Sequence, residues 1–161
     1  MKSAKTEKVE IRLRLMTSVD IAAVSDIEEE SFPDPWPRSA FEEIAKNPEH
    51  GALVAVIDDK IIGYGCYLVI ANETHLSNLA VKPEFRRKSV AKQILDYIMT
   101  VARRKNCEYI LLEVRPRNES AIAFYEQAGF KLLYRRPRYY RNPVEDALVM
   151  VYYFPENESL S

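Results

Sequence analysis

The chain has 161 residues, of which 47% are hydrophobic and 29% are charged, proportions that are ordinary for a folded globular protein. Its 23 basic and 24 acidic residues give a net charge of −1, so the overall charge predicts neither a nucleic-acid nor a membrane partner. No apolar run approaches the roughly 20 residues of a membrane helix, and the first eight residues lack a signal-peptide core, so we expect a cytoplasmic protein.

The first third of the chain predicts a strand followed by two helices. Residues 9–15 alternate between apolar and polar side chains, as a half-buried strand does. Thr17 or Ser18 then caps a helix whose inward residues are Ile21, Val24 and Ile27. The prolines in 31–37 make a stiff loop that presents Phe32 and Trp36. A second helix begins at Arg38 or Ser39 and runs to residue 46.

Two strands at 52–57 and 61–70 form a predicted hairpin around residues 58–60, and Gly63 and Gly65 indicate a bulge or a close approach. A further strand at 75–81 ends before Pro83. A long amphipathic helix at 89–105 follows, with these apolar residues on its inward face: Val90, Ile94, Ile98 and Ala102.

The basic run Arg86-Arg87-Lys88 lies at the N-terminal end of this long helix. A helix N-terminus already carries partial positive charge, so three cations beside it raise the local potential further. A bound anion would relieve that cost, because free backbone N–H groups and basic side chains would converge on it. The alternative is a solvated charge run without a ligand.

The last third predicts a buried strand, a helix and two closing strands. Residues 109–114 are nearly all apolar, as in a strand buried on both faces. A helix then opens at Glu119 or Ser120 and ends at Gly129 in a left-handed cap. Strands at 131–135 and 147–154 close the chain. The order β-α-α-β-β-β-α-β-α-β-β predicts a single domain over residues 1–161, with its core at about 9–154. We expect a mixed sheet with helices on both faces, and a parallel, right-handed crossover from the strand at 75–81 to the strand at 109–114.

Three polar residues in strand 109–114 and in the turn and helix that follow it are candidates for chemistry. Glu113 is the one residue of its strand that is charged at neutral pH, and it stands at the carboxyl end, where open α/β sheets place ligands, so it is a candidate general base. It could instead face solvent, or pair with Arg115 or Arg117. Tyr125 is either a proton donor or a core residue, and Asn118 either holds a ligand amide or only caps a turn.

The strand, R-x-x-S-x-A turn and helix around Arg86 resemble the acetyl-CoA pyrophosphate loop of the GNAT N-acetyltransferase superfamily. Ser89 stands where that family usually has glycine, so its Cβ narrows the approach to phosphate unless its hydroxyl donates a hydrogen bond instead. The segment EVRPRNESAIAFYEQAGF at 113–130 and the stretch YYRNPVEDALVM are similar to RimI-type protein N-terminal acetyltransferases, including archaeal ones.

The resemblance implies a GNAT fold, α/β with a mostly antiparallel central sheet, and acetyl-CoA as cofactor. It implies Glu113 as general base and Tyr125 as general acid, with His75 assisting through water. It assigns the pantetheine and acetyl group to the backbone of one strand, and the pyrophosphate to the basic turn. The implied acetyl-CoA ligands are Leu79, Ala80, Val81, Arg86, Arg87, Lys88, Ser89, Val90, Ala91, Lys92 and Asn118.

The resemblance also implies a peptide acceptor between the 31–37 loop and the last hairpin loop. Phe32, Pro33 and Tyr139 could form a slot for the first residues, and Asp34 or Glu30 could bind the ammonium, although the loop could equally pack on itself. An early acidic patch and a late basic run at 131–141 flank this region, and the basic run could attract an acidic peptide or ribosomal surface. We place the following residues in the acidic patch: Asp26, Glu28, Glu29, Glu30 and Asp34.

The sequence therefore predicts a protein N-α-acetyltransferase whose partner is a protein or peptide N-terminus, with ribosomal proteins as one candidate class, and it does not specify an oligomeric state. Acetylation of a small amine or a lysine side chain is the nearest alternative. A non-catalytic CoA-binding module, or an RNA-binding surface on the basic run, is a further alternative. No metal site is expected, because the two cysteines and two histidines lack ligand spacing, and Cys66 and Cys107 are expected to be packing residues.

Overall fold

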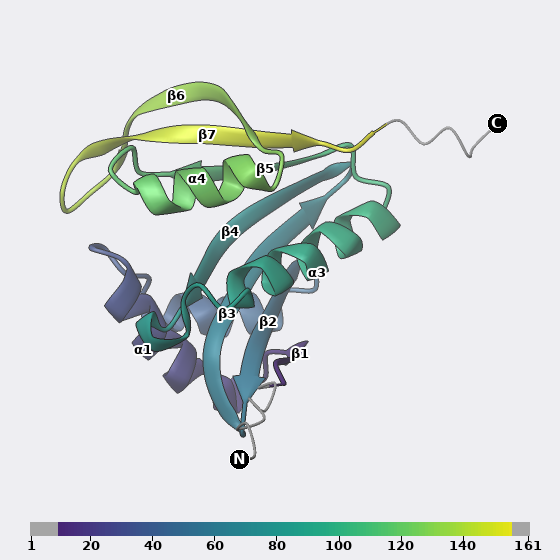
Figure 1. Ribbon diagram of the computed structural model, residues 1–161, viewed down its shortest axis with the longest axis vertical. Coiled ribbons are helices and arrows are strands. Elements are labelled where there is room, and N and C mark those ends of the chain that lie inside the picture. Colours follow the sequence, from purple (N-terminus) through teal and green to yellow (C-terminus); the bar gives the residue numbers. More distant parts are fainter. Residues whose placement is uncertain (1–9, 156–161) are drawn as a thin grey trace, which may run out of the picture.

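The computed structural model describes residues 10–155, and within them one twisted sheet of seven strands organises the fold (Figure 1). The strand order is β1-β2-β3-β4-β5-β7-β6, and every neighbouring pair is antiparallel except β4 and β5. The mixed, mostly antiparallel sheet and the parallel β4–β5 pair are confirmed. The strands are β1 (Arg12–Leu15), β2 (His50–Ile57), β3 (Lys60–Ile70), β4 (Glu73–Val81), β5 (Tyr109–Val114), β6 (Lys131–Tyr140) and β7 (Glu145–Tyr153).

Helices cover both faces of the sheet, in the predicted order. α1 (Ile21–Ser31) and α2 (Arg38–Lys46) pack on one face, and α3 (Val90–Arg104) and α4 (Glu119–Gln127) pack on the other. Two cores form because successive residues of a strand face opposite sides of the sheet. On β2, Val54 belongs to the α1–α2 core, while Leu53 and Ala55 belong to the α3–α4 core. Short 3₁₀ turns, η1 (Ser18–Asp20) and η2 (Pro83–Phe85), precede α1 and α3.

The β2–β3 hairpin and its glycines follow the sequence prediction. Asp58 and Asp59 both have positive φ, 48° and 63°, which matches the right-handed twist of a tight hairpin. At Gly65 an added Cβ would lie 2.6 Å from Cγ2 of Ile94 on α3. The predicted close approach is confirmed: this glycine lets α3 lie directly on the sheet.

Two features of β4 shape the centre of the molecule. Its ladder with β5 extends only from Glu73–Tyr109 to His75–Leu111, whereas its ladder with β3 continues to Val81, so β4 and β5 diverge within the described residues (Figure 1). The register with β3 also shifts at Ser77, where β4 carries an extra residue. Such a bulge reverses the alternation of side chains. Leu76 faces the α3–α4 core, but Ala80 faces the α1–α2 core.

Several predicted boundaries were wrong. β1 begins at Arg12 rather than residue 9, and residue 9 lies outside the described residues. β5 is buried on one face and half-exposed on the other, not buried on both. β6 continues to Tyr140 instead of ending at residue 135, because it is an edge strand, where a proline such as Pro137 disrupts no further ladder. β7 extends from Glu145 to Tyr153, earlier at both ends than predicted.

Other predictions were confirmed. Both cysteines are buried, and Gly129 follows α4 with φ +100° as a left-handed cap. None of the helices in the described residues is both long and apolar enough to cross a membrane.

Asp20→Asn is expected to lower the free energy of unfolding at pH 7 by about 1–2 kcal/mol. Arg14 donates hydrogen bonds of 2.7 and 2.9 Å to the two Asp20 oxygens, and the Thr17 N–H donates another of 2.7 Å. The Arg14 bond above all, opposed by burial, lowers the pKa of Asp20 from 3.8 to about 2. Because the folded-state pKa is depressed, this stabilisation is present above about pH 4 and is lost as the pH falls towards 2. Urea unfolding at pH 7 and pH 2.5 checks this, and an equal difference between variant and wild type at both values contradicts it.

Candidate active site

His75 and Glu113 meet where β4 and β5 begin to diverge. The Nε2 atom of His75 lies 2.5 Å from Oε2 of Glu113, although the residues are 38 positions apart in the chain. Their side chains are 32% and 16% exposed, so the pair is partly shielded but reachable from solvent. Both side chains lie on the face opposite α3, since their neighbours Leu76 and Leu112 are in the α3–α4 core. The geometry supplies a carboxylate whose orientation is held by an imidazole.

The predicted alternative partners of Glu113 pair elsewhere. Arg115 and Arg117 approach Glu145, at 3.1 and 3.7 Å. Arg115 also donates to the backbone oxygens of Pro143 and Arg141, at 3.0 and 2.9 Å. The alternative in which an arginine neutralises Glu113 is therefore wrong. Arg115 instead binds the backbone of the β6–β7 loop and the Glu145 carboxylate.

Tyr125 is buried on α4, where its ring packs against Phe124 and Phe130. Burial raises the pKa of its phenol further above neutral pH. Its packing confirms that it is a core residue.

Tyr140 is half-buried at the end of β6, and the sequence did not predict it as a site residue. Burial raises the pKa of Tyr140, and the negative charge of Glu113 raises it further. The Arg115 guanidinium stacks 4.4 Å from the centre of the Tyr140 ring. The Tyr140 ring is therefore held by Arg115, two residues after Glu113 in the chain. The sequence signal for it was its place in the stretch YYRNPVEDALVM, which resembles the family and lies in the predicted acceptor loop.

The turn before α3 holds two residues in the left-handed region, Arg87 at φ 63° and Ser89 at φ 64°. Glycine adopts this backbone readily, which accounts physically for the usual glycine of the motif at Ser89. Arg86 bends back so that its Nε donates 3.1 Å to the oxygen of Val81. Val90 is buried, so only its backbone could contact a ligand. Arg87, Lys88 and Lys92 are exposed. Lys92 forms an ion pair of 2.9 Å with Asp96. The start of α3 thus combines free N–H groups with exposed cations.

The sequence profile of the Acetyltransferase (GNAT) family matches residues 21–130. The chain belongs to this family. An uncharacterised N-acetyltransferase of Methanocaldococcus jannaschii is 34% identical over 143 residues, covering 86% of this chain and 89% of the relative. The ribosomal protein bS18-alanine N-acetyltransferase of Salmonella typhimurium is 28% identical over 140 residues, covering 86% and 94%.

Solved structures show the same fold. The ribosomal-protein-S18-alanine N-acetyltransferase of Escherichia coli superposes with a TM-score of 0.84 at 24% identity, covering 94% of this chain and 99% of that one. NAA60 of Arabidopsis thaliana in complex with acetyl-CoA superposes with a TM-score of 0.82 at 17% identity, covering 90% and 99%. This GNAT protein is an acetyl-CoA-dependent N-acetyltransferase.

The described residues of this GNAT enzyme fit acetyl-CoA. The divergence of β4 from β5 leaves the β4 backbone from Leu79 to Val81 without a β5 partner, so these peptide groups are available to an extended acyl chain. The side chains of Ala80 and Val81 are buried, so they contribute through backbone. The N-terminus of α3 and its cations suit the pyrophosphate. Asn118 caps α4, its Oδ1 accepting from the N–H of Ala121 at 3.2 Å, as its capping alternative predicted.

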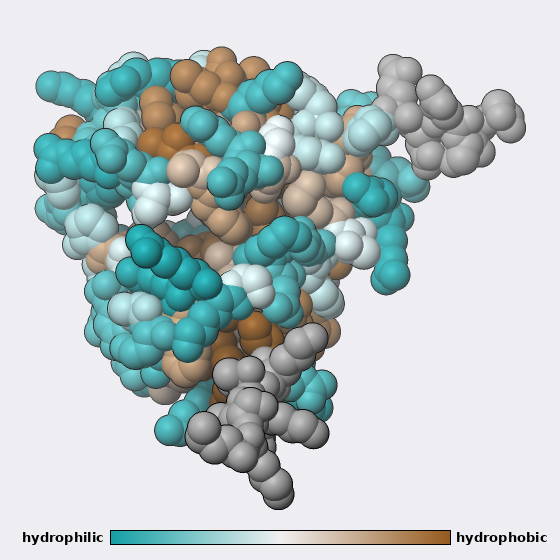
Figure 2. All heavy atoms as spheres, in the orientation of Figure 1, coloured by the Kyte–Doolittle hydropathy of each residue, from teal (hydrophilic) through white to brown (hydrophobic). Residues whose placement is uncertain are grey.

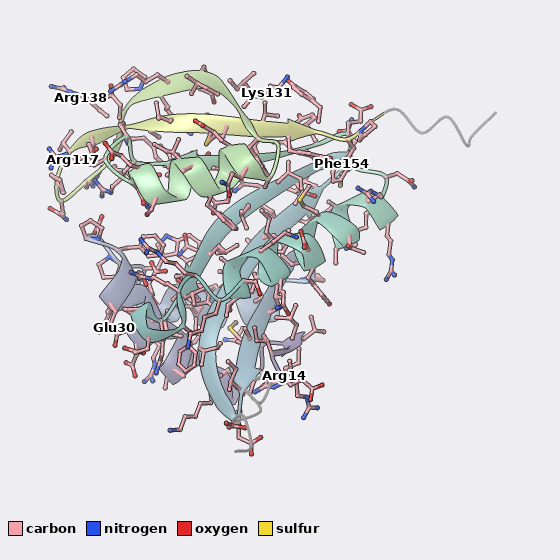
Figure 3. All side chains as sticks on the ribbon, viewed as in Figure 1. Arg14, Glu30, Arg117, Lys131, Arg138 and Phe154 are labelled. Atoms are coloured by element: carbon pink, nitrogen blue, oxygen red, sulfur yellow. The ribbon has the colours of Figure 1, made fainter. Side chains whose placement is uncertain are left out.

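The two predicted acceptor walls of the GNAT enzyme lie on different halves of the molecule. The surface is hollowed between the half that carries β5 to β7 and the half that carries α1 (Figure 2). Arg117 and Arg138 lie on one side of this hollow and Glu30 on the other (Figure 3). On the α1 side Asp34 is exposed and Phe32 packs against the α1–α2 core. On the other side Tyr139 is 39% exposed, with Arg136 stacked 4.6 Å from its ring centre.

Two residues of the α1 side differ from expectation. Trp36 packs on Phe41 with ring centres 5.7 Å apart, so it is partly a core residue. Glu28 is buried, not part of a surface acidic patch, whereas Glu29 and Glu30 are exposed as predicted. A cavity of about 630 Å³ between η1 and α2 includes none of the predicted site residues.

Ser89→Gly is expected to raise the free energy of unfolding by about 0.5–1 kcal/mol, because glycine relieves the left-handed backbone at φ 64°. Acetyl-CoA affinity should be kept or tightened. Urea unfolding and calorimetric titration with acetyl-CoA measure the two effects. Ser89→Ala is the matched control, since it removes the hydroxyl and keeps the strain. Clear weakening of acetyl-CoA binding in both variants would show instead that the hydroxyl is a ligand.

Proposed function

We propose that this protein is an N-α-acetyltransferase that transfers acetyl from acetyl-CoA to the free α-amino group of a protein or peptide N-terminus. The observation that carries the proposal is the His75–Glu113 pair, 2.5 Å apart at the divergence of β4 and β5. The names of relatives that acetylate the alanine of ribosomal protein bS18 support a protein acceptor, with ribosomal proteins as one candidate class. The proposed domain is a single one over residues 1–161, with its core at about 9–154.

Glu113 acts as the general base in this proposal. An α-amine has a pKa of about 8, so a sizeable fraction is protonated at neutral pH and must lose a proton before it attacks. Glu113 accepts this proton, directly or through one water, and His75 keeps the carboxylate turned towards the acceptor. Asp34 or Glu30, on the α1 side, attracts the ammonium as it arrives, and Phe32, Pro33 and Tyr139 line the slot.

Acetyl-CoA, when bound, supplies the acetyl group as a thioester. In the proposal the backbone of Leu79, Ala80 and Val81 holds its acyl end, and the exposed cations and N–H groups of the 86–92 turn hold its pyrophosphate. Asn118 contributes its amide nitrogen from the start of α4. Tyr125 carries its phenolic proton at neutral pH, as any tyrosine does, and in the proposal it donates that proton to the departing sulfur.

Labelled acetyl transfer to a matched set of acceptors tests the proposal. The set contains short peptides with free N-terminal alanine, serine or methionine, the same peptides with a blocked N-terminus and an internal lysine, and small primary amines. Transfer to the free N-termini alone is the expected result. Transfer to lysine or small amines alone would replace the acceptor class, and no transfer to any amine would overturn the proposal.

A further inference from the structure

Glu28 is a buried carboxyl that the proposed mechanism does not use. Its side chain is only 1% exposed on the sheet-facing side of α1, although the neighbouring Glu29 and Glu30 are exposed. Removing a carboxyl from water is costly unless hydrogen bonds replace the lost hydration. Burial raises the pKa of Glu28, against the opposing effect of its hydrogen bonds. A helix that needed only to pack would be served as well by an apolar side chain at this position.

The hydrogen bonds of Glu28 come from three different segments. The backbone N–H of Trp36, in the loop after α1, donates to Oε2 at 2.9 Å. The amide nitrogen of Asn78, on β4, donates to Oε1 at 2.6 Å. The hydroxyl of Tyr64, on β3, donates to the same oxygen. One side chain therefore joins the 31–37 loop to two strands of the sheet.

The two ends of this connection lie beside the two substrates of the proposed reaction. The loop carries Phe32, Pro33 and Asp34, the proposed acceptor wall. Asn78 directly precedes Leu79, the first residue proposed to hold the acyl group. Asn78 reaches Glu28 only because the Ser77 bulge turns it to the α1–α2 side of the sheet.

We infer that Glu28 is a positioning residue that holds the acceptor loop in register with the acyl-binding part of β4. The inference rests on the proposed function for its account of the two substrates. Two hydrogen bonds from the strands fix the Glu28 carboxyl, and the third, from the Trp36 N–H, limits the positions that the loop can adopt. A misplacement of about 1 Å can cost about 100-fold in rate. Because the loop carries the proposed acceptor wall, loss of the bridge should affect the peptide more than the cofactor.

Glu28→Gln is the primary test, because it preserves shape but places an NH₂ group where two acceptor oxygens are needed. The expected result is a fall of at least about tenfold in kcat/KM for the peptide, carried by a raised peptide KM, with the dissociation constant of acetyl-CoA within about twofold of wild type. Glu29→Gln, on the exposed neighbour, should leave both values unchanged. Unchanged peptide kinetics in Glu28→Gln, or an equal loss of peptide and acetyl-CoA binding, would overturn the inference.

Trp36 provides a second readout that needs no acceptor. It is the single tryptophan of the sequence, and its own N–H is one of the three donors to Glu28. Glu28→Gln should shift its fluorescence emission to the red and increase its quenching by acrylamide, with unchanged circular dichroism. Asn78→Ala, which cuts only the β4 connection, serves if Glu28→Gln does not fold and should raise the peptide KM in the same way. If the wild type acetylates no peptide, the proposed function fails, while unchanged Trp36 emission in Glu28→Gln refutes the bridge itself.

Discussion

Glu113→Gln is expected to lower kcat for peptide acetylation by about 10²–10⁴-fold, the usual contribution of a general base. The amide keeps the size of the side chain and a contact with His75 but cannot take a proton from the acceptor amine. Affinity for acetyl-CoA should change little, since the proposed cofactor contacts come from β4 and the turn before α3. Steady-state kinetics with a saturating peptide, together with calorimetric titration of acetyl-CoA, separate the two effects.

Glu126→Gln is the control for this prediction, because Glu126 is exposed on α4 beside Tyr125 and takes no part in the proposed chemistry. It should retain wild-type rates. A collapse of acetyl-CoA affinity in Glu113→Gln, with the rate at saturation preserved, would remove Glu113 from the role of base. Raising the assay pH gives a further check. A high pH deprotonates the amine without assistance, so the defect should shrink as the pH rises above about 8.

Phe41→Ala is expected to lower the free energy of unfolding by about 3–5 kcal/mol, in the range found when a fully buried phenylalanine is truncated. Phe41 on α2 is 0% exposed, and its ring meets Tyr64 edge-on and Trp36 at an angle, both with centres 5.7 Å apart. The cavity would lie directly beneath the loop that carries the proposed acceptor wall. The melting temperature should fall by about 10 °C, since each kcal/mol corresponds to about 2–4 °C in a chain of this size.

Phe41→Leu is the matched control, since it fills most of the volume without the aromatic contacts, and it should cost clearly less than the alanine variant. Urea unfolding of the three proteins followed by circular dichroism measures the series. Equal losses in the leucine and alanine variants would show that the ring contacts, and not the filled volume, stabilise this core.

Side-chain pattern placed the elements with strong periodicity correctly and the edge of the sheet less well. The helical stripe before residue 105 and the apolar strand at 109–114 were predicted because side-chain periodicity reports local geometry. The edge strand β6 was predicted too short, since Pro137 and the basic residues around it are as compatible with a loop as with an unpaired sheet edge. Local pattern does not contain the position of a strand within its sheet.

The candidate site likewise contains residues that the sequence identified and residues that it did not. Glu113 was recognisable as an ionisable residue at the end of an apolar strand, and the basic turn was recognisable by its position before a helix. Tyr140 and Glu28 were not recognised, because their surroundings come from β5, β3 and β4 rather than from adjacent residues. A glutamate in an acidic run looks exposed until the fold decides which of its neighbours face solvent.

The sequence by itself determined the order of the elements, the family and the residue types available for acid–base chemistry, since these depend on periodicity and on short contiguous motifs. Only the tertiary structure decided that His75 contacts Glu113 and that the Ser77 bulge turns Asn78 towards Glu28. It also decided that β4 parts from β5 and leaves the backbone at 79–81 without a β5 partner. The physical reason is that each of these depends on strand register and on contacts between distant segments. These contacts are stabilised because the fold buries both faces of one sheet, which requires several segments of the chain to pack together.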